Sequence, residues 1–473
     1  MATNKLHIAI VSSPGIGHLS PVLLLADRLV NNHNLHVTVI AVTTSTSAAQ
    51  SQLISSITTN NHLSVIQIPA ADISSIVAPD AKIVTQLCVM MKETVPSIRS
   101  VISAMDQHRP HVLIGDIFAY ESWVVAEEFG MQKFVFVTSN AWFTGLFVYS
   151  PVLDKKVVGQ YVDQTQGFEI PGCRHVSPDD VVDPMMDRAD DSYRAYLDQA
   201  VRVTLTDGML INTWEDLEPQ SLDALRNNDI LRSVVNNKPV YTVGPISRRS
   251  EPVDVKSGVI EWLEKQPENS VLYVSFGSGG TISHEQTKEL AWGLEMSQQR
   301  FVWVVKPPTG KGSDGSYFSQ MGGTPVPPDY FPDGFMTRTQ KLGFLVSSWA
   351  PQVEILNHKS VGGFLTHCGW NSTLESITSG VPMIVWPLYA EQRMNATMLT
   401  DELEVAVGPA VLPTKKVVGR EEIEKMIRVL MESRKGKTIR DNAKMLQESS
   451  DKAIKGSSGI SIRKFIEDCW SRI

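Results

Sequence analysis

The stretch IAIVSSPGIGHLSPVLLLADRLV, residues 8–30, contains three patterns that together predict one structural unit. An apolar run leads into a glycine turn at Gly15-Ile16-Gly17, and apolar residues at helical spacing follow. A buried strand, a tight turn and an amphipathic helix in this order are typical of a parallel α/β sheet. The turn also carries His18, at the end of the strand where ligands of such sheets bind.

The same alternation of β-rich and helical segments continues along the chain. The β-rich runs lie at residues 35–42, 62–69, 111–116 and 133–139 in the first half, and at 270–278, 301–307, 343–349, 361–370 and 381–387 in the second. Between these two series, VGPISRRSEPVDVKSG (243–258) is polar, contains two prolines and is typical of a linker. We therefore predict an α/β protein with two units of similar size, in which two facing sheets would make an interdomain cleft, a common ligand site.

Composition excludes several classes of function. The 473 residues are 42% hydrophobic and 20% charged, with a net charge of −8 and no basic stripe, so we expect no nucleic-acid partner. No apolar run approaches the length of a membrane span, and no signal peptide is evident. The cysteines are widely scattered, which favours a reducing compartment and a cytoplasmic location. They are Cys88, Cys173, Cys368 and Cys469.

The glycine turn is a poor match to a dinucleotide-binding fingerprint. Ser20 stands where the third glycine should be. The next β-rich run ends in Thr43, Thr44 and Ser45, so it offers no acidic side chain for a ribose. We therefore expect neither a nicotinamide nor a flavin cofactor.

The segment from Trp349 to Gln392 has residue types suited to a nucleotide joined to a sugar. Trp349 offers an aromatic face at the end of a β-rich run. Gly369 opens a later helix, whose free amides and positive dipole end would hold an anion. The next apolar run is followed by polar groups at the sheet edge, namely Tyr389, Glu391 and Gln392.

Residues 307–334 are rich in glycine, proline and serine and show no period. This composition favours a surface insertion. The alternative is a rim of an acceptor pocket, with Tyr317 and Phe318 as contacts.

Segment 349–392 resembles the signature box of the plant family 1 UDP-glycosyltransferases in length, order and nearly every marker residue. The resemblance extends through the turn at residues 15–18, LINTWEDLEP (210–219) and VLYVSFGS (271–278), and the N-terminal half is most similar to phenol O-glucosyltransferases of the hydroquinone (arbutin-forming) type. It implies the GT-B fold, in which two Rossmann-like domains face each other across an interdomain cleft. The implied domains are an acceptor-binding domain at 1–245, a UDP-sugar-binding domain at 246–455, and a C-terminal helix at 456–473 that packs back on the first domain.

The resemblance also implies a role for each residue of the donor site. Trp349 stacks on uracil, the backbone of Ala350 binds its edge, and Gln352 and Glu375 take the ribose hydroxyls. The remaining donor residues are His367, Asn371, Ser372 and Ser278 at the diphosphate, and Trp370, Tyr389, Glu391 and Gln392 around the sugar. Many family members carry Asp where this chain has Glu391, so the charge is retained with a reach one methylene longer.

His18 and Asp116 are the predicted catalytic pair, and both match the family's positions. Glycosyl transfer needs a base that deprotonates the acceptor hydroxyl, and histidine suits that role near neutrality. Asp116 ends the run 111–116 at the carboxyl edge of the same sheet, where a carboxylate would orient the imidazole and stabilise its cation.

Each of these residues also has a simpler structural interpretation. Trp349 alone would be a core residue, Glu375 a solvated helix face, His18 a turn histidine and Asp116 a cap for the helix that follows it. A metal site is also disfavoured, because His367-Cys368 lacks the second ligand pair that zinc requires. The joint pattern, and not any single residue, favours the catalytic interpretation.

The predicted acceptor pocket is aromatic and apolar. Its candidate residues, each of which could instead belong to the core, are Phe118, Trp142, Phe143 and Phe147. We expect a flat aromatic acceptor such as a hydroquinone-like phenol, a monolignol or indoxyl.

The combined prediction is a monomeric, metal-independent inverting glucosyltransferase that uses UDP-glucose as co-substrate, needs no cofactor and releases UDP. The alternatives are the same fold acting with another UDP-sugar or on an aromatic amine, and a non-catalytic nucleotide-sugar binding protein. A glycosidase is disfavoured, because hydrolysis normally uses two facing carboxylates and this site has one acid behind a histidine.

Overall fold

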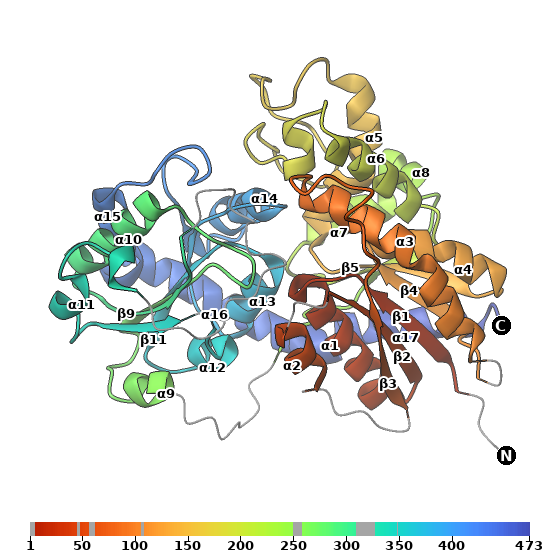
Figure 1. Ribbon diagram of the computed structural model, residues 1–473, viewed down its shortest axis with the longest axis horizontal. Coiled ribbons are helices and arrows are strands. Elements are labelled where there is room, and N and C mark those ends of the chain that lie inside the picture. Colours follow the sequence, from red (N-terminus) through yellow and green to blue (C-terminus); the bar gives the residue numbers. More distant parts are fainter. Residues whose placement is uncertain are drawn as a thin grey trace. The chain divides into compact units, whose positions relative to one another are not determined.

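A computed structural model describes residues 5–44, 48–55, 62–105, 108–248, 258–308, 327–347 and 349–473. The chain forms two compact units: Met1–Ile246 together with Lys452–Ile473, and Ser247–Asp451. Each unit is built around its own parallel β-sheet with helices packed against it (Figure 1). The predicted α/β fold class with two parallel-sheet domains is confirmed.

In the described part of the first unit, seven strands form one sheet in the order β3-β2-β1-β4-β5-β6-β7. The strands are β1 (His7–Ser12), β2 (His36–Thr43), β3 (Leu63–Pro69), β4 (Val112–Asp116), β5 (Gln132–Val137), β6 (Gly208–Ile211) and β7 (Val240–Thr242). Every residue of β1 is buried, as expected for a parallel strand covered on both faces. Because β1 pairs with β2 on one side and β4 on the other, the sheet's switch point lies between β1 and β4.

The helices of the first unit connect these strands, and the last one returns from the end of the chain. They are α1 (Ile16–His33), α2 (Ala48–Ser55), α3 (Ile83–Ser103), η1 (Ala119–Ser122), α4 (Trp123–Glu128), α5 (Ala141–Lys156), η2 (Asp183–Met186), α6 (Asp191–Val203), α7 (Pro219–Asn227), α8 (Asp229–Val234) and α17 (Ser457–Trp470).

Helix α17 completes the core of the first unit. Its Ile462, Phe465 and Cys469 are buried within the same cluster as β1 and α1. The Phe465 ring lies edge-on to Phe134, with 5.0 Å between the ring centroids. Burying three such side chains removes a large apolar area from water, so the helix contributes several kcal/mol, on the order of 1.5–3 for each large side chain.

The second unit has a six-stranded parallel sheet within the described residues, in the order β10-β9-β8-β11-β12-β13. The strands are β8 (Val271–Ser275), β9 (Arg300–Val305), β10 (Gly343–Ser347), β11 (Val361–Thr366), β12 (Met383–Val385) and β13 (Ala406–Val407). The switch point here lies between β8, which also pairs with β9, and β11, which also pairs with β12. Both units therefore place a switch point at the carboxyl ends of two adjacent central strands.

Helices of the second unit cover its sheet and lead back to the first unit. They are α9 (Gly258–Leu263), α10 (His284–Ser297), η3 (Pro328–Tyr330), α11 (Phe335–Arg338), α12 (Gln352–Leu356), α13 (Trp370–Thr378), α14 (Gln392–Thr397), the π-helical η4 (Met398–Glu402), α15 (Arg420–Glu432) and α16 (Arg434–Lys455).

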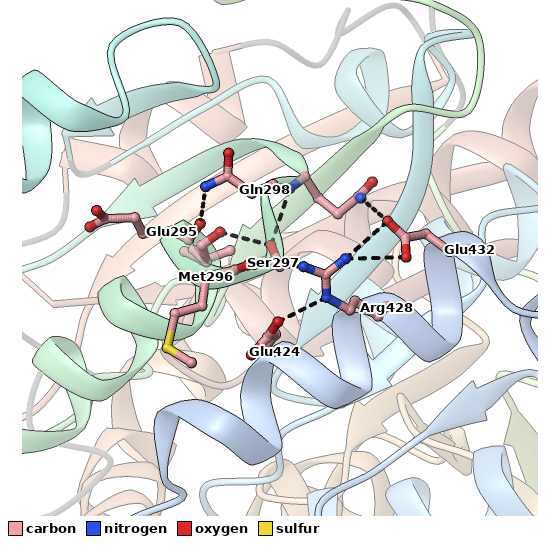
Figure 2. A network of polar contacts seen from close by, with 9 residues as sticks. Glu295, Met296, Ser297, Gln298, Glu424, Arg428 and Glu432 are labelled. Carbon is pink, nitrogen blue, oxygen red and sulfur yellow. Dashed lines mark hydrogen bonds and ion pairs between the residues drawn. The ribbon is translucent and has the colours of Figure 1, made fainter.

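A polar network joins the end of α10 to α15 (Figure 2). The Arg428 guanidinium donates to Glu424 Oε1 at 2.9 Å and to the carbonyl oxygen of Met296 at 3.1 Å, and Gln299 donates to Glu432 at 2.6 Å. Arg428 thus satisfies a carbonyl group at a helix C-terminus, which has no partner within its own helix. Because the Arg428 guanidinium is largely exposed to solvent, we assign the network a structural role and expect its ion pairs to contribute little stability.

The short strands β6, β7 and β13 were not predicted. Each has between two and four residues, which is too short for a period or a continuous apolar run to stand out. Among the helices that the structure describes, none combines the length and the apolar character needed to cross a membrane.

Candidate functional site

His18 lies in the first turn of α1, at the switch point of the first sheet. The turn before it requires glycine, because Gly15 has a φ of 111°, a conformation that side-chain-bearing residues rarely adopt. The amide of His18 donates to the carbonyl oxygen of Gly15 at 3.2 Å. The His18 side chain is 15% exposed, so it is held by the turn while a ligand can still reach it.

Asp116, the last residue of β4, has its carboxylate beside the His18 ring. His18 Nδ1 lies 3.5 Å from Asp116 Oδ2, and it has no closer polar partner among the described residues. That separation is longer than an ordinary N–H···O hydrogen bond. Catalytic contacts of this kind are often long without substrate and shorten when charge develops on the base.

The carboxylate of Asp116 is fully buried and fixed from both sides. Oδ2 accepts from the amide and the hydroxyl of Ser13, at 2.7 and 2.6 Å, and Oδ1 accepts from the amides of Phe118 and Ala119, at 2.9 and 3.1 Å. The pKa of Asp116 is lowered overall: burial raises it, but His18 and the donated bonds of Ser13 outweigh burial. Asp116 therefore stays a carboxylate.

The contacts of Asp116 are compatible with both roles that the sequence left as alternatives. Oδ1 caps the turn that begins η1, as a purely structural aspartate would. Oδ2 lies toward His18 and is held there by Ser13. Sequence reasoning missed Ser13, although its position directly after β1 could have indicated a residue at the site.

The predicted acceptor residues occupy the region after β4 and the first turns of α5. Phe118 lies edge-on to His18, with 5.1 Å between ring centroids, so an aromatic surface adjoins the imidazole. Phe143 stacks on Phe147 at 5.5 Å, and Phe147 in turn contacts Tyr196. All four predicted residues are buried; they are Phe118, Trp142, Phe143 and Phe147.

The N-terminus of α5 is capped by two side chains. Asn140 accepts from the amide of Phe143 at 2.7 Å. Glu218, from the LINTWEDLEP segment, accepts from the amides of Ala141 and Trp142 at 3.0 and 2.8 Å. Burial raises the pKa of Glu218, which the helix amides partly oppose. The LINTWEDLEP segment thus has a structural role that the sequence did not reveal. Through Glu218 it caps the N-terminus of α5, the helix that carries the aromatic acceptor candidates.

The start of the predicted donor site combines an exposed tryptophan with a buried backbone. Trp349 is 68% exposed, so its ring is accessible for stacking and is not part of the core. Ala350 is buried beside it. Pro351 stands at the N-cap of α12, one residue before the first helical residue. Trp349 is therefore the most accessible aromatic face at this edge of the second sheet's described residues.

Gln352, Ser372 and Glu375 form a connected polar group. Gln352 Nε2 donates to Ser372 Oγ at 2.9 Å and to Glu375 Oε2 at 2.6 Å, which ties α12 to α13. Burial raises the pKa of Glu375. The structure thus brings together the two residues predicted to bind ribose and one predicted to bind phosphate.

His367 follows β11 directly and is almost fully buried. Its pKa is lowered to about 3, first by burial and then by the nearby charge of Lys306. His367 Nδ1 is buried and has no hydrogen-bond partner among the described residues. The imidazole is therefore neutral at physiological pH and has a ring nitrogen available for a ligand.

Two non-glycine residues with positive φ stand in the turns of the donor site. Cys368 has a φ of 64° and stands two residues before Trp370, the first residue of α13, and Ala390 has a φ of 54° between β12 and α14. Asn395 Nδ2 donates to the carbonyl oxygen of Cys368 at 2.9 Å and so supports the first turn. Such backbone strain costs about 1–3 kcal/mol per residue and clusters at functional sites.

The carboxamide oxygen of Gln392 is already engaged. Oε1 accepts from the amides of Leu388 and Tyr389, at 2.9 and 3.1 Å. These two bonds use both lone pairs of the oxygen, so Nε2 is left as the group that can bind a ligand. A ligand would therefore be bound by the two Nε2 donors of Gln392 and not by its oxygen.

The remaining donor candidates lie near these groups. Trp370 and Asn371 are the first residues of α13, Tyr389 and Glu391 lie between β12 and α14, and Ser278 follows β8 and is exposed. Lys306, which sequence reasoning missed, donates to the backbone of Ser278. Its place in the sequence, a single cationic residue directly after the apolar run FVWVV, could have indicated a residue at the site.

Two further predictions concern the insertion and a metal. Tyr317 and Phe318 lie outside the described residues. Within the described ranges, no group of three or more His, Cys, Asp or Glu side chains is arranged to hold a metal ion.

Comparisons with known proteins identify the family to which the chain is similar. Residues 240–447 match the profile of a family described as UDP-glucoronosyl and UDP-glucosyl transferase. The chain is 48% identical to anthocyanidin 3-O-glucosyltransferase 5 of Manihot esculenta, over 99% of this chain and 96% of that protein. It is 40% identical to hydroquinone glucosyltransferase of Rauvolfia serpentina, over 95% and 94% of the two chains. A solved structure of TcCGT1 in complex with UDP superposes with a TM-score of 0.92, at 47% identity and 99% coverage of both chains.

Proposed function

Since the chain belongs to the plant family 1 UDP-glycosyltransferases, we propose that it transfers glucose from UDP-glucose to a hydroxyl of a small phenolic or related aromatic acceptor, with inversion at the anomeric carbon. The products are a β-glucoside and UDP. In this proposal the first unit supplies the base and the acceptor site, and the second unit binds the donor.

The proposal rests chiefly on the pair His18 and Asp116. A buried carboxylate that receives four donated bonds beside a partly accessible imidazole is suited to orient a general base. With Asp116 facing Nδ1, the proton of the neutral ring lies on Nδ1, and Nε2 is the basic atom.

The reaction follows from these groups. His18 Nε2 accepts the proton of the acceptor hydroxyl as the oxygen attacks the anomeric carbon, opposite the diphosphate. The new C–O bond forms as the bond to the phosphate oxygen breaks, and its electron pair leaves with UDP. Asp116 stabilises the imidazolium during this step, because the carboxylate bears the opposite charge and is already ionised.

In the second unit, the assignment of donor contacts is supported by the local chemistry of each residue. The exposed ring of Trp349 suits stacking on uracil, and the Glu375 carboxylate suits two vicinal ribose hydroxyls. Neutral His367, Asn371, Ser372 and Ser278 suit the diphosphate. Tyr389, Glu391 and Gln392 suit the glucose hydroxyls, with Gln392 acting through Nε2.

For the acceptor, aromatic side chains beside the base favour a flat, apolar molecule. Phe118 adjoins His18, and Trp142 Nε1 is buried with no partner among the described residues, so it could donate to a polar atom of the acceptor. Phe147 is fully buried and contacts Tyr196, so its contribution would be to support Phe143.

The direct test measures UDP release and product mass with UDP-glucose and a panel of phenols, aromatic alcohols and aromatic amines. We expect a glucoside of at least one phenol with β configuration by NMR. Transfer only to amines, or only from another UDP-sugar, would support the neighbouring alternatives within the family. Tight UDP binding without turnover on any acceptor would indicate a binding protein.

A further inference from the structure

Lys306 directly follows β9, and its side chain donates to backbone carbonyl groups of the turn after β8. Its ammonium Nζ lies 2.5 Å from the carbonyl oxygens of both Gly277 and Ser278, the residues that follow β8. Because β8 pairs with β9 and with β11, Lys306 and His367 lie at the carboxyl ends of strands that flank β8. The carboxyl ends of β9, β8 and β11 are therefore adjacent, next to the switch point of the second sheet.

Among the residues that the structure describes, Lys306 has no counter-ion. Across the described ranges, no carboxylate lies within ion-pair distance of its Nζ. An ammonium has three donors, and the two carbonyl groups account for two of them. Burial lowers the pKa of Lys306 to about 8, because the surroundings of the ammonium group disfavour its charged form. A cation in such surroundings favours the binding of an anion.

His367 lies directly against the turn that Lys306 holds. A Cβ atom built on Gly277 would come within 2.4 Å of the His367 ring, so the ring packs on the backbone of that glycine. Gly277 also has a φ of 71°, which a side-chain-bearing residue rarely adopts. In the planar trans peptide between Gly277 and Ser278, the carbonyl points to Lys306, so the Ser278 N–H points the opposite way.

We propose that Lys306 is a positioning residue for the donor's diphosphate, which orients the Gly277–Ser278 turn beside His367 and supplies positive charge to the leaving group. The inference rests on the proposed function, because it assumes that the second unit binds a UDP-sugar. When the bond between the anomeric carbon and the phosphate oxygen breaks, the electron pair and its negative charge stay on UDP. Lys306 keeps its proton throughout and stabilises that charge electrostatically.

The test compares uridine, UMP and UDP as ligands of the full chain, with affinities measured by calorimetry. Lys306→Met removes the charge and keeps an unbranched stem, and Lys306→Arg retains the charge. We expect Lys306→Met to weaken UDP binding roughly ten- to hundredfold, UMP binding less, and uridine binding less than about twofold. Lys306→Arg should recover most of the UDP affinity.

Lys341→Met is the matched control. Lys341 is exposed and precedes β10, at the amino end of the sheet, and its loss changes the net charge by the same amount. We expect its UDP affinity to equal that of the wild type. An equal loss of uridine and UDP affinity in Lys306→Met would show a purely structural role and overturn the inference, as would unchanged UDP affinity.

The wild type provides a second measurement in case Lys306→Met does not fold. UDP affinity should fall as pH rises above about 8, where free Lys306 loses its proton, and Lys306→Arg should remove this fall. His367, which faces Lys306, is already neutral across this range. A pH-independent affinity would overturn the inference. Wild-type protein that binds UDP no more tightly than uridine would instead overturn the proposed function itself.

Discussion

His18 and His367 both lie at the switch point of their own sheet and have opposite electrostatic surroundings. Each follows a central strand at a switch point, His18 after β1 and His367 after β11. His18 has the carboxylate of Asp116 3.5 Å from its ring. His367 has the Lys306 cation as its charged neighbour and is more deeply buried, so its pKa falls to about 3.

This difference suits one residue type to the two tasks that we propose for it. A carboxylate beside an imidazole favours the cation that forms when a base takes up a proton. Burial and a cation disfavour the same charge, which leaves a neutral ring for hydrogen bonding. The neighbouring charge therefore distinguishes the proposed base, His18, from the proposed donor-site histidine, His367.

The largest expected effect comes from removing the base. His18→Ala should lower kcat for a weakly acidic alcohol acceptor roughly 10²- to 10⁴-fold, since deprotonation of the acceptor is lost. UDP-glucose binding should remain, because its proposed contacts are in the second unit. Initial rates and donor affinity are measured on the same preparation. Turnover at the wild-type rate would remove His18 from the mechanism; strongly acidic phenols should retain more activity, because they ionise unaided.

The next effect comes from neutralising the acid behind the base. Asp116→Asn should lower kcat and leave the affinity for UDP-glucose nearly unchanged, since the lost interaction acts mainly as the imidazolium forms. Both oxygens of Asp116 accept hydrogen bonds, so the NH2 group of asparagine would lie against a donor, either from Ser13 or from Phe118 and Ala119. The lost bonds should cost about 1–3 kcal/mol of stability.

Because of this second effect, kcat for Asp116→Asn must be expressed per folded molecule, with the folded fraction determined from thermal unfolding. Ser13→Ala serves as the control, because it removes one hydrogen bond to Asp116 and keeps the charge. If Asp116→Asn were unstable but fully active per folded molecule, Asp116 would be a cap alone.

A smaller effect concerns the sugar in the second unit. We expect kcat/KM for UDP-glucose to exceed that for UDP-galactose by at least about tenfold, because inverting the 4-hydroxyl leaves a buried group unpaired. With Gln392 Oε1 engaged by the backbone, the discrimination should come from the Nε2 donors. Gln392→Ala should narrow the gap mainly by impairing glucose transfer. Competition between the two donors with one phenol measures it, and equal use by the wild type contradicts it.

The smallest expected effect is on acid stability. The folded pKa of His367, about 3, lies below the unfolded value of about 6.5, so the unfolded chain binds more protons between these values. Its contribution to stability is therefore full above pH 6.5 and is lost as pH falls, by on the order of 1 kcal/mol per pH unit. The free energy of unfolding, measured with urea, should therefore fall less between pH 6.5 and 5.5 in His367→Gln than in the wild type. Equal losses in both proteins would show that His367 is not held neutral.

The sequence was sufficient for features that depend on local pattern. Continuous apolar runs and turn glycines such as Gly15 mark buried parallel strands and their connections, because both are set by neighbouring residues. The contact between Ser13 and Asp116 joins positions 103 residues apart, and no periodicity reports such a pairing. The same applies to Glu218 at the start of α5 and to Lys306 on the turn after β8.

Gln392 illustrates a different limit. Its identity and position were predicted, but its oxygen is committed to the turn formed by Leu388 and Tyr389. Which atoms of a side chain remain available depends on the backbone around it, and residue type alone does not specify this.

Helix α17 has a consequence for synthesis on the ribosome. The core of the first unit includes Ile462, Phe465 and Cys469, which are translated after the whole of the second unit. Domains generally fold as units during synthesis, at about 5–20 residues per second. The second unit can thus complete its core first, whereas the first unit keeps an apolar groove uncovered for on the order of ten seconds or more, a period during which chaperones would have access to it.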